Sequence, residues 1–190
     1  MANFSWSFPY PSQRMPVLAR NIVATSQPLA AQAGLHMLRQ GGNAVDAAVA
    51  TAIAMTVLEP TTNAIGSDSF ALVWFQGQLF GLNASGRAPK SLASSRFEGM
   101  KEVPHLGWDP VTVPGAVSGW MVLSQKFGRL PFEKLFEPAI DYAENGFPVA
   151  PLTAGLWARS PKRYANRAGA VCRRLRRPPS ESSHSPTVRR

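Results

Sequence analysis

Cysteine is nearly absent from this sequence of 190 residues, which contains only Cys172. A single cysteine excludes a disulfide within the chain and any metal site built from several thiolates. The histidines do not replace it, because His36, His105 and His184 lie far apart in the sequence and have no carboxylate or cysteine partners at ligand spacing. We therefore expect no metal site and no cofactor. The low cysteine content is typical of a reducing compartment.

Long hydrophobic runs are also lacking. The most apolar stretch, residues 44–58, is interrupted by Asp46, Thr51 and Thr56 and is too short to span a bilayer. Residues 1–16 show no early basic cluster and no continuous apolar segment, so they do not resemble a secretory signal. These absences predict a cytoplasmic protein that does not associate with a membrane.

Acidic residues are scarce in the C-terminal part. Residues 1–158 contain ten Lys or Arg and ten Asp or Glu, whereas residues 159–190 contain ten basic residues and the single acid Glu181, which accounts for the whole net charge of +9. The chain therefore divides into a neutral globular region, 1–158, and a tail, 159–190, rich in Arg, Pro and Ser. The tail shows no apolar periodicity, and this composition predicts disorder.

The basic tail leaves two interpretations open. One is a non-catalytic module that binds nucleic acid or an anionic surface through contacts of residues 159–190 to phosphate, although the tail has no aromatic residue beyond Tyr164 on which bases could stack. The other is truncation or translation in a shifted reading frame, which would produce such an abrupt change of composition. The second fits the sequence better, so we expect no nucleic-acid partner.

A first helix is predicted near the N-terminus. Ser26 is a suitable N-cap, and Pro28 suits the first turn, where its missing N–H has no intrahelical partner to lose. Apolar residues then recur at helical spacing as far as Arg39, and Gly41 can end the helix in the left-handed conformation.

A second helix is predicted to follow at once. Asn43 is a good N-cap, and Asp46 stands at the third helical position, where a carboxylate is favoured. The following residues are apolar almost all round the helix as far as Leu58, so the helix must be covered on most sides. The pair 59–60, Glu-Pro, ends it.

The later elements predict an α/β fold. Residues 70–75 and 78–82 are rich in Phe, Val, Leu and Trp and are separated by Gln-Gly, which is typical of a β-hairpin. Helical spacing returns at 117–127, before Gly128, and again from Pro131 to the Asn-Gly at 145–146.

Five separated motifs occur in a fixed order. They occupy residues 27–50 with the Glu-Pro at 59–60, and then 65–71, 83–89, 113–116 and 127–132. Together they resemble the N-terminal part of the large subunit of the γ-glutamyltransferase (γ-glutamyltranspeptidase, glutathione hydrolase) family. The resemblance covers about residues 15–158.

The resemblance implies a fragment of an N-terminal-nucleophile hydrolase, in which two stacked sheets lie between helical layers, an αββα sandwich. In that family a precursor cuts itself, and the new N-terminal threonine of the small subunit is the nucleophile and, through its α-amine, its own base. It attacks the γ-amide of glutathione-like substrates, and related members act on glutaryl amides. The implied partners are therefore a γ-glutamyl or glutaryl amide and a separate small-subunit polypeptide.

The resemblance supplies no catalytic residue. None of the eight threonines of this chain matches the cleavage motif of the family. We expect the chain to be a truncated fragment, inactive by itself. Two polar residues within the motifs, Asp46 at a helix start and Ser67 in the usually Gly-rich loop at 65–70, are expected to have structural roles.

One substrate-binding residue is implied. Typical members have the pattern Arg-Glu-x-Ala-Pro, in which the arginine binds the α-carboxylate of the glutamyl group. The corresponding residues 85–89 are Ser-Gly-Arg-Ala-Pro, so Ser85 occupies the usual arginine position and Arg87 lies two residues later. A guanidinium can bind a carboxylate through two parallel hydrogen bonds, so we predict that Arg87 contacts substrate. The alternative is a loop arginine in a surface salt bridge. The displacement itself suggests an altered substrate choice.

Overall fold

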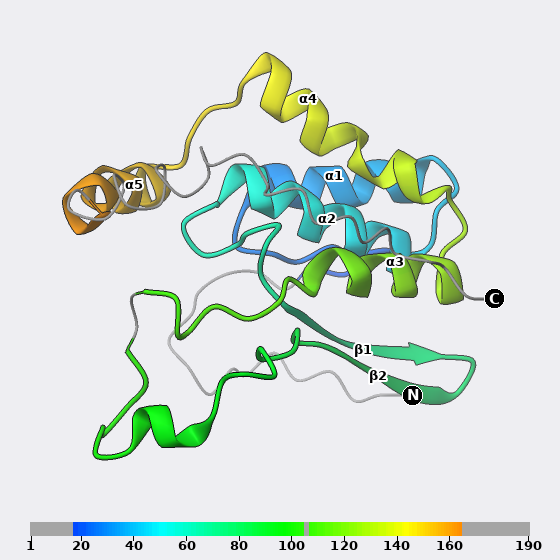
Figure 1. Ribbon diagram of the computed structural model, residues 1–190. Coiled ribbons are helices and arrows are strands. Elements are labelled where there is room, and N and C mark those ends of the chain that lie inside the picture. The colour runs from blue at the N-terminus through cyan, green and yellow to red at the C-terminus, as the bar shows by residue number, and fades with distance from the viewer. Residues whose placement is uncertain (1–16, 105–106, 165–190) are drawn as a thin grey trace, which may run out of the picture.

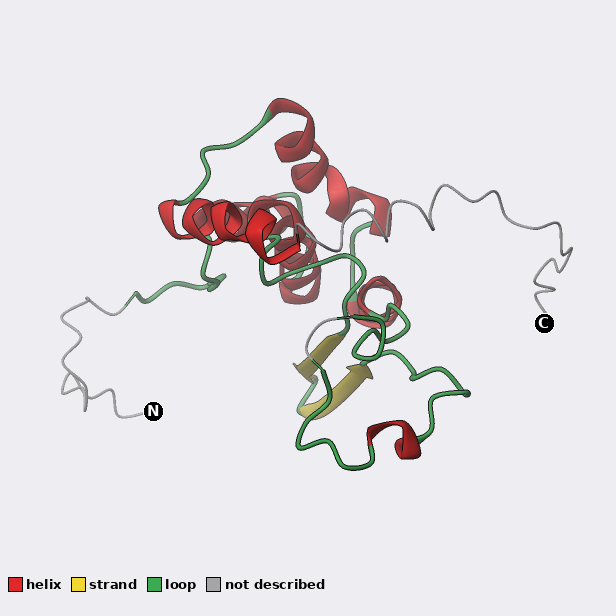
Figure 2. Cartoon of the chain, turned by 60° about the vertical axis from the view of Figure 1, so that its left-hand side comes forward, coloured by secondary structure: helices red, strands yellow, loops and turns green. Residues whose placement is uncertain are grey.

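The computed structural model describes residues 17–104 and 107–164, which form a layer of helices beside a two-stranded antiparallel sheet (Figure 1). The longer elements are α1 (Pro28–Arg39), α2 (Ala44–Leu58), β1 (Ser69–Phe75), β2 (Gln78–Ala84), α3 (Ala116–Phe127), α4 (Glu137–Asn145) and α5 (Pro151–Tyr164). Short 3-10 helices cover Ser94–Phe97 and Phe132–Phe136. The long helices lie to one side of the two strands, as the view by secondary structure shows (Figure 2).

The N-cap of the first helix lies one residue after the predicted cap, Ser26. Gln27 is the N-cap, and its side-chain oxygen accepts a hydrogen bond from Leu29 N at 2.6 Å. The prediction of Ser26 as the cap is wrong, because its hydroxyl instead donates to Glu59 Oε2 at 2.7 Å, beyond the end of α2. The side chain of Ser26 thus forms a tertiary hydrogen bond and does not cap the helix. Gly41 has the predicted left-handed backbone, with φ of 89°.

The second helix begins with the predicted capping box, and its carboxylate also fastens a distant loop. Asn43 Oδ1 accepts from the N–H groups of Val45 and Asp46, while Asp46 Oδ2 accepts from Asn43 N at 2.8 Å. The fully buried Asp46 also accepts from the backbone N–H groups of Arg129 and Leu130, which follow α3. Its role is therefore structural, as expected from the sequence.

The hydrophobic core lies entirely among helices. A Cβ at Gly34 of α1 would overlap Thr51 Oγ1 and lie 2.9 Å from Ala47 O, so the glycine permits the close approach of α1 and α2. Trp120 of α3 closes this core from the side of the sheet. The buried members are Ala30, Ala33 and Met37 in α1; Val49, Ala50, Ile53, Ala54, Met55 and Leu58 in α2; Ala116 and Trp120 in α3; Leu135; and Ala139 in α4.

The hairpin forms where it was predicted, with a slightly longer ladder. Gln76 and Gly77 have φ of 50° and 79°, which matches the tight turn whose twist suits a β-hairpin. The ladder extends outward to the pair Ser69 and Ala84. Gly119 allows α3 to lie directly on the sheet, because a Cβ there would lie 2.8 Å from Ala84 Cβ.

The last described helix crosses the predicted boundary of the globular region. α5 runs from Pro151 to Tyr164, so residues 159–164, assigned to the tail, are helical. The predicted disorder, the shifted-frame interpretation and the surface-binding alternative otherwise concern residues 165–190, which lie outside the described residues. In the part of the chain that the structure describes, no helix combines the length and apolarity needed to cross a membrane.

Candidate functional site

Three of the sequence motifs meet where the hairpin joins the helical layer. Ser67, just before β1, accepts hydrogen bonds through its carbonyl from Gly115 N at 3.0 Å and Ala116 N at 2.9 Å. These are N–H groups at the start of α3, which have no partner within the helix. The Ser67 hydroxyl donates to Ala64 O at 2.6 Å and so shapes its own loop. Ser67 therefore holds the loop at 65–68 against α3, in line with its expected structural role.

The loop after β2 packs against the same place through glycines. Gly86 has φ of 68°, and a Cβ on it would overlap Val113 O. A Cβ on Gly115 would overlap Ala84 O and lie 2.9 Å from Gly86 N. Both positions therefore exclude larger residues, since backbone lies against backbone there. This contact fixes the position of the backbone just before Arg87.

Arg87 lies exposed in this loop, three residues beyond the end of β2. Its carbonyl accepts from Val113 N at 3.2 Å, which fixes its backbone. Its guanidinium makes no hydrogen bond or ion pair with any of the described residues, whereas Arg96 pairs with Asp109 at 2.7 Å. The surface salt bridge considered for Arg87 is thus not formed within the described part of the chain, and the side chain is free to bind an anion.

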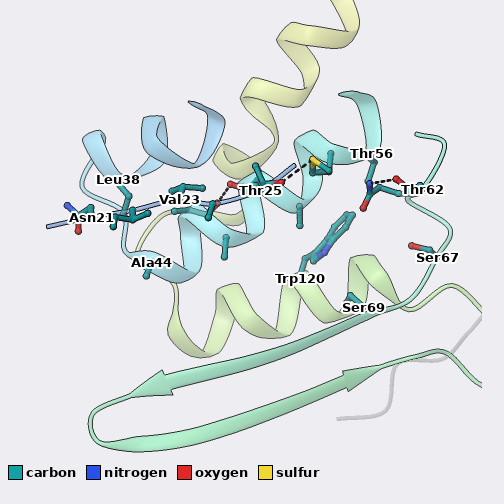
Figure 3. Close-up of a pocket in the computed structure, with 18 of the residues that line it drawn as sticks. Asn21, Val23, Thr25, Leu38, Ala44, Thr56, Thr62, Ser67, Ser69 and Trp120 are labelled. Carbon is teal, nitrogen blue, oxygen red and sulfur yellow. Dashed lines mark hydrogen bonds between the residues drawn. The ribbon is translucent and has the colours of Figure 1, made fainter. Parts of the chain in front are cut away.

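A groove of about 690 Å³ begins beside this junction (Figure 3). The extended segment 20–25 forms one wall, α2 lies along another, and the loop at 62–69 closes one end. Trp120 projects from α3 toward this space, between Thr62 and Ser69 in the view of Figure 3. Ser67 and Ser69 belong both to the motif junction and to the groove, but Arg87 is not among the residues that line it.

The hydroxyl groups in the groove are not activated for catalysis. Thr25 donates to Met55 Sδ at 3.4 Å, and Thr51 and Thr56 donate to backbone carbonyls of α2. A nucleophilic hydroxyl needs an adjacent base that accepts its proton. The charged residues that line this groove are Arg20 and Asp68, and its lining includes no histidine. None of these three hydroxyls donates to a carboxylate or an imidazole, so the groove offers a surface for binding and they form no nucleophile–base pair in it.

Sequence reasoning located Ser67 and Arg87 but missed the features that join them. The contact of Gly86 with Val113 depends on two loops that are far apart in sequence. Only the unusual density of glycine and proline in both loops gave a signal. Across residues 17–104 and 107–164, no group of three or more His, Cys, Asp or Glu side chains is arranged to hold a metal ion.

Comparison with known proteins identifies the family. The family model described as gamma-glutamyltranspeptidase matches residues 30–174, which extends beyond the predicted globular boundary at 158. A glutathione hydrolase-like proenzyme of Bacillus subtilis is 40% identical over 134 residues, which are 69% of this chain and 26% of that protein. The chain thus spans about a quarter of the length of this relative.

Solved structures agree with this match. A cephalosporin acylase from Bacillus halodurans is 55% identical, has a TM-score of 0.75, and is matched over 85% of this chain and 31% of its own. The γ-glutamyltranspeptidase of Helicobacter pylori is 29% identical, with a TM-score of 0.74, over 83% of this chain and 47% of its own.

These matches confirm the expected fold class, a partial α/β fold of the N-terminal-nucleophile hydrolases. They give no support to the alternative of a nucleic-acid-binding module. On the match over residues 30–174, the chain belongs to the γ-glutamyltranspeptidase family and corresponds to one part of its fold.

Proposed function

We propose that this chain forms part of the binding half of an amidohydrolase that acts on γ-glutamyl or glutaryl amides. The chemistry would be completed by a second polypeptide that carries the N-terminal threonine. The family match over residues 30–174 carries this proposal. The names of several relatives as proenzymes support it, since a proenzyme is processed before it acts.

Arg87 is the proposed contact to the substrate carboxylate. It is exposed and unpaired among the described residues, and its backbone is fixed by the bond from Val113. A guanidinium held in this way keeps its donors available for a bidentate contact. In a substrate such as a γ-glutamyl amide, the α-carboxylate is the group that would bind there.

Activity in a completed fold tests this proposal. The chain alone should not hydrolyse γ-glutamyl p-nitroanilide. A hybrid in which residues 17–158 replace the matched segment of the Bacillus subtilis relative should do so. In that hybrid Arg87→Ala should lower kcat/KM about 30-fold or more, because a charge-assisted contact is lost. Lys90→Ala removes an exposed cation from the same loop and should change kcat/KM less than about twofold. Turnover by the isolated chain, or equal effects of the two variants, would contradict the proposal.

A second candidate is an acylase that prefers glutaryl amides, which keep the terminal carboxylate of a γ-glutamyl amide but lack its α-amine. Two observations favour it: Ser85 stands where the family pattern has its arginine, and the matched structure at 55% identity is a cephalosporin acylase. The same hybrid then should cleave glutaryl p-nitroanilide faster than γ-glutamyl p-nitroanilide. Because both compounds carry this terminal carboxylate, Arg87→Ala should lower both rates to a similar extent if Arg87 binds it, and should lower neither if it does not.

The cytoplasmic location and the absence of membrane association are also proposals. The proposed location is supported by the low cysteine content. Fractionation of cells that express the native gene would test them, and recovery of the protein outside the cytoplasm would contradict them.

A further inference from the structure

The end of the hairpin that leads to Arg87 also carries a carboxylate. The last pair of the ladder at this end joins Ser69, labelled in Figure 3, and Ala84. The residues just beyond this pair, Asp68 and Ser85, therefore stand next to each other across the hairpin. Arg87 follows Ser85 by two residues in the same loop. A carboxylate and a guanidinium are thus present at one end of the sheet.

One backbone segment holds both of these residues. The carbonyl of Ser67, which directly precedes Asp68, accepts a hydrogen bond from Gly115 N at 3.0 Å. The carbonyl of Arg87 accepts from Val113 N at 3.2 Å. Val113 and Gly115 are two residues apart, which corresponds to at most about 7 Å of extended chain. The backbones at Asp68 and Arg87 are therefore fixed close to each other.

Neither charge has a partner within residues 17–104 and 107–164. The side chains of Asp68 and Arg87 are exposed and form no hydrogen bond or ion pair there. Arg20 lines the same groove as Asp68 but makes no ion pair with it. An arginine at position 85, where the typical family pattern has one, would stand directly beside Asp68 and would neutralise it. Ser85 and the shift of the arginine to position 87 leave both charges available.

The two candidate substrates differ in one charged group. A γ-glutamyl amide has a carboxylate and an ammonium on the same carbon, whereas a glutaryl amide has only the carboxylate. When Arg87 binds this carboxylate, the ligand lies close to the carboxylate of Asp68. Asp68 then attracts a ligand that carries the ammonium and repels a ligand that lacks it.

We infer that Asp68 binds the α-ammonium of a γ-glutamyl group whose α-carboxylate is bound by Arg87, and that it thereby selects γ-glutamyl over glutaryl amides. The inference rests on the proposed function in taking Arg87 as the contact to the carboxylate. Asp68 determines specificity and takes no part in breaking the amide bond.

Binding of two small amides to the full 190-residue chain tests the inference. The probes are γ-L-glutamyl methylamide and glutaryl methylamide, which differ only in the α-ammonium, and NMR titration at pH 7 gives their dissociation constants. We expect the γ-glutamyl probe to bind at least about fivefold more tightly, as is typical of an exposed charge pair. Equal affinities, tighter binding of the glutaryl probe, or no binding of either probe overturns the inference.

Substitutions at Asp68 separate this role from a structural one. Asp68→Asn keeps the shape of the side chain but removes its charge. The affinity for the γ-glutamyl probe should therefore fall about fivefold, while the affinity for the glutaryl probe should rise. A structural defect would change both affinities in the same direction, and such a result overturns the inference. Asp68→Glu keeps the charge and should keep a preference for the γ-glutamyl probe, and equal affinities in this variant contradict the inference.

Two control variants complete the binding experiment. Arg87→Ala should weaken both probes, because both carry the carboxylate that it binds. Glu98→Gln removes an exposed carboxylate elsewhere in the segment between β2 and α3 and should leave both affinities unchanged. An effect of Glu98→Gln as large as that of Asp68→Asn would show that only the net charge matters, which overturns the inference. Circular dichroism of each variant checks that the helices remain.

Turnover by the hybrid enzyme keeps the inference apart from the proposed function. If the hybrid cleaves γ-glutamyl p-nitroanilide, and Asp68→Asn leaves its preference over glutaryl p-nitroanilide unchanged, the proposed function stands and the inference is overturned. If the hybrid cleaves neither anilide, but the chain binds the probes with a preference that depends on Asp68, the inference stands and the proposed function is contradicted.

Discussion

The helical layer and the hairpin differ in how far their large apolar side chains are buried. In the helices, large side chains such as Met37, Leu58 and Leu135 are fully buried and contribute to one continuous core. In the hairpin, Phe70, Leu72 and Trp74 are mostly exposed, and neither strand contributes to that core. Fully burying a side chain of this size stabilises a protein by about 1.5–3 kcal/mol, so the hairpin gives up much of this stabilisation.

The helical layer and the hairpin differ in how much of their apolar surface is buried by other residues of this chain. Within the helical layer, the buried carboxylate of Asp46 is hydrogen-bonded and Gly34 allows close packing of α1 against α2. The sheet has one face covered by α3 and one left open, and a two-stranded ribbon is marginally stable in water. Changes in the helical layer should therefore affect folding, whereas changes on the outer face of the sheet should affect association.

The largest loss of stability is expected from Asp46→Ala. The substitution removes the fully buried acceptor of the backbone N–H groups of Asn43, Arg129 and Leu130, and should lower the free energy of unfolding by about 3 kcal/mol. Urea denaturation followed by circular dichroism measures it. Asp68→Ala, at an exposed carboxylate, serves as control and should change stability by less than about 0.5 kcal/mol. Similar values for both would show that the helical layer does not depend on this buried carboxylate.

The next largest effect is expected from Gly34→Ala. The added Cβ would overlap Thr51 Oγ1 and force α1 away from α2, at a cost of about 2 kcal/mol. Gly66→Ala is the matched change, since a Cβ there meets no atom within 4 Å. Thermal unfolding should separate the two variants clearly, and a lower midpoint for Gly66→Ala than for Gly34→Ala would reverse the argument.

A smaller effect is expected from Tyr142→Phe, which tests the docking of α4 on α1. The Tyr142 hydroxyl donates to Leu29 O at 3.1 Å, and its loss should cost about 1 kcal/mol at pH 7. Burial, with a further contribution from the charge of Asp141, raises the pKa of Tyr142 above its usual value. The folded state therefore holds this proton more tightly than the unfolded state does.

The sign of the pH dependence follows from that shift. The stabilisation is fully present below about pH 10 and is lost as the pH rises through the raised pKa of the folded state. Between pH 9 and 11, unfolding free energies of the unchanged chain should thus fall more steeply than those of Tyr142→Phe. Parallel curves would show that the proton on Tyr142 does not contribute.

The smallest change in stability is expected from the triple variant Phe70→Thr, Leu72→Thr and Trp74→Thr. These side chains are mostly exposed, so their loss should alter the unfolding free energy by less than about 0.5 kcal/mol, while threonine keeps the preference for a strand. Self-association of the isolated chain, measured by light scattering, should decrease. A large loss of stability would show that the outer face is already packed within this chain.

Local sequence predicted the elements whose signals lie within a few residues. The capping box of Asn43 and Asp46, the stop at Gly41 and the Gln-Gly turn each depend on neighbours along the chain, and each was found where predicted. Ser26 failed as a cap because Glu59 competes for its hydroxyl from beyond the end of α2. The helix α5 continues past residue 158, the predicted end of the globular region, and its residues 159–163 are polar apart from one proline.

The candidate site divides in the same way. The sequence indicated Arg87 through a motif, and its binding role stays a prediction. Its position depends on the contact between Gly86 and Val113, which no local pattern reveals. The groove beside the motif junction could not be predicted either, because it is bounded by segments 20–25, 44–56 and 62–69, whose relative placement depends on packing.

By itself, the sequence determined the family, the order of the elements and the absence of a matched nucleophile, because motifs and turn residues are properties of short stretches. The tertiary structure alone decided that Asp46 binds the loop after α3, that the guanidinium of Arg87 has no partner among the described residues, and that α3 packs on the sheet. These outcomes depend on contacts between residues that are far apart in the sequence. Packing brings such residues together, and the local sequence does not show which of them will meet. Asp46 found three backbone partners in this way, and the edge of β1 found none among the described residues.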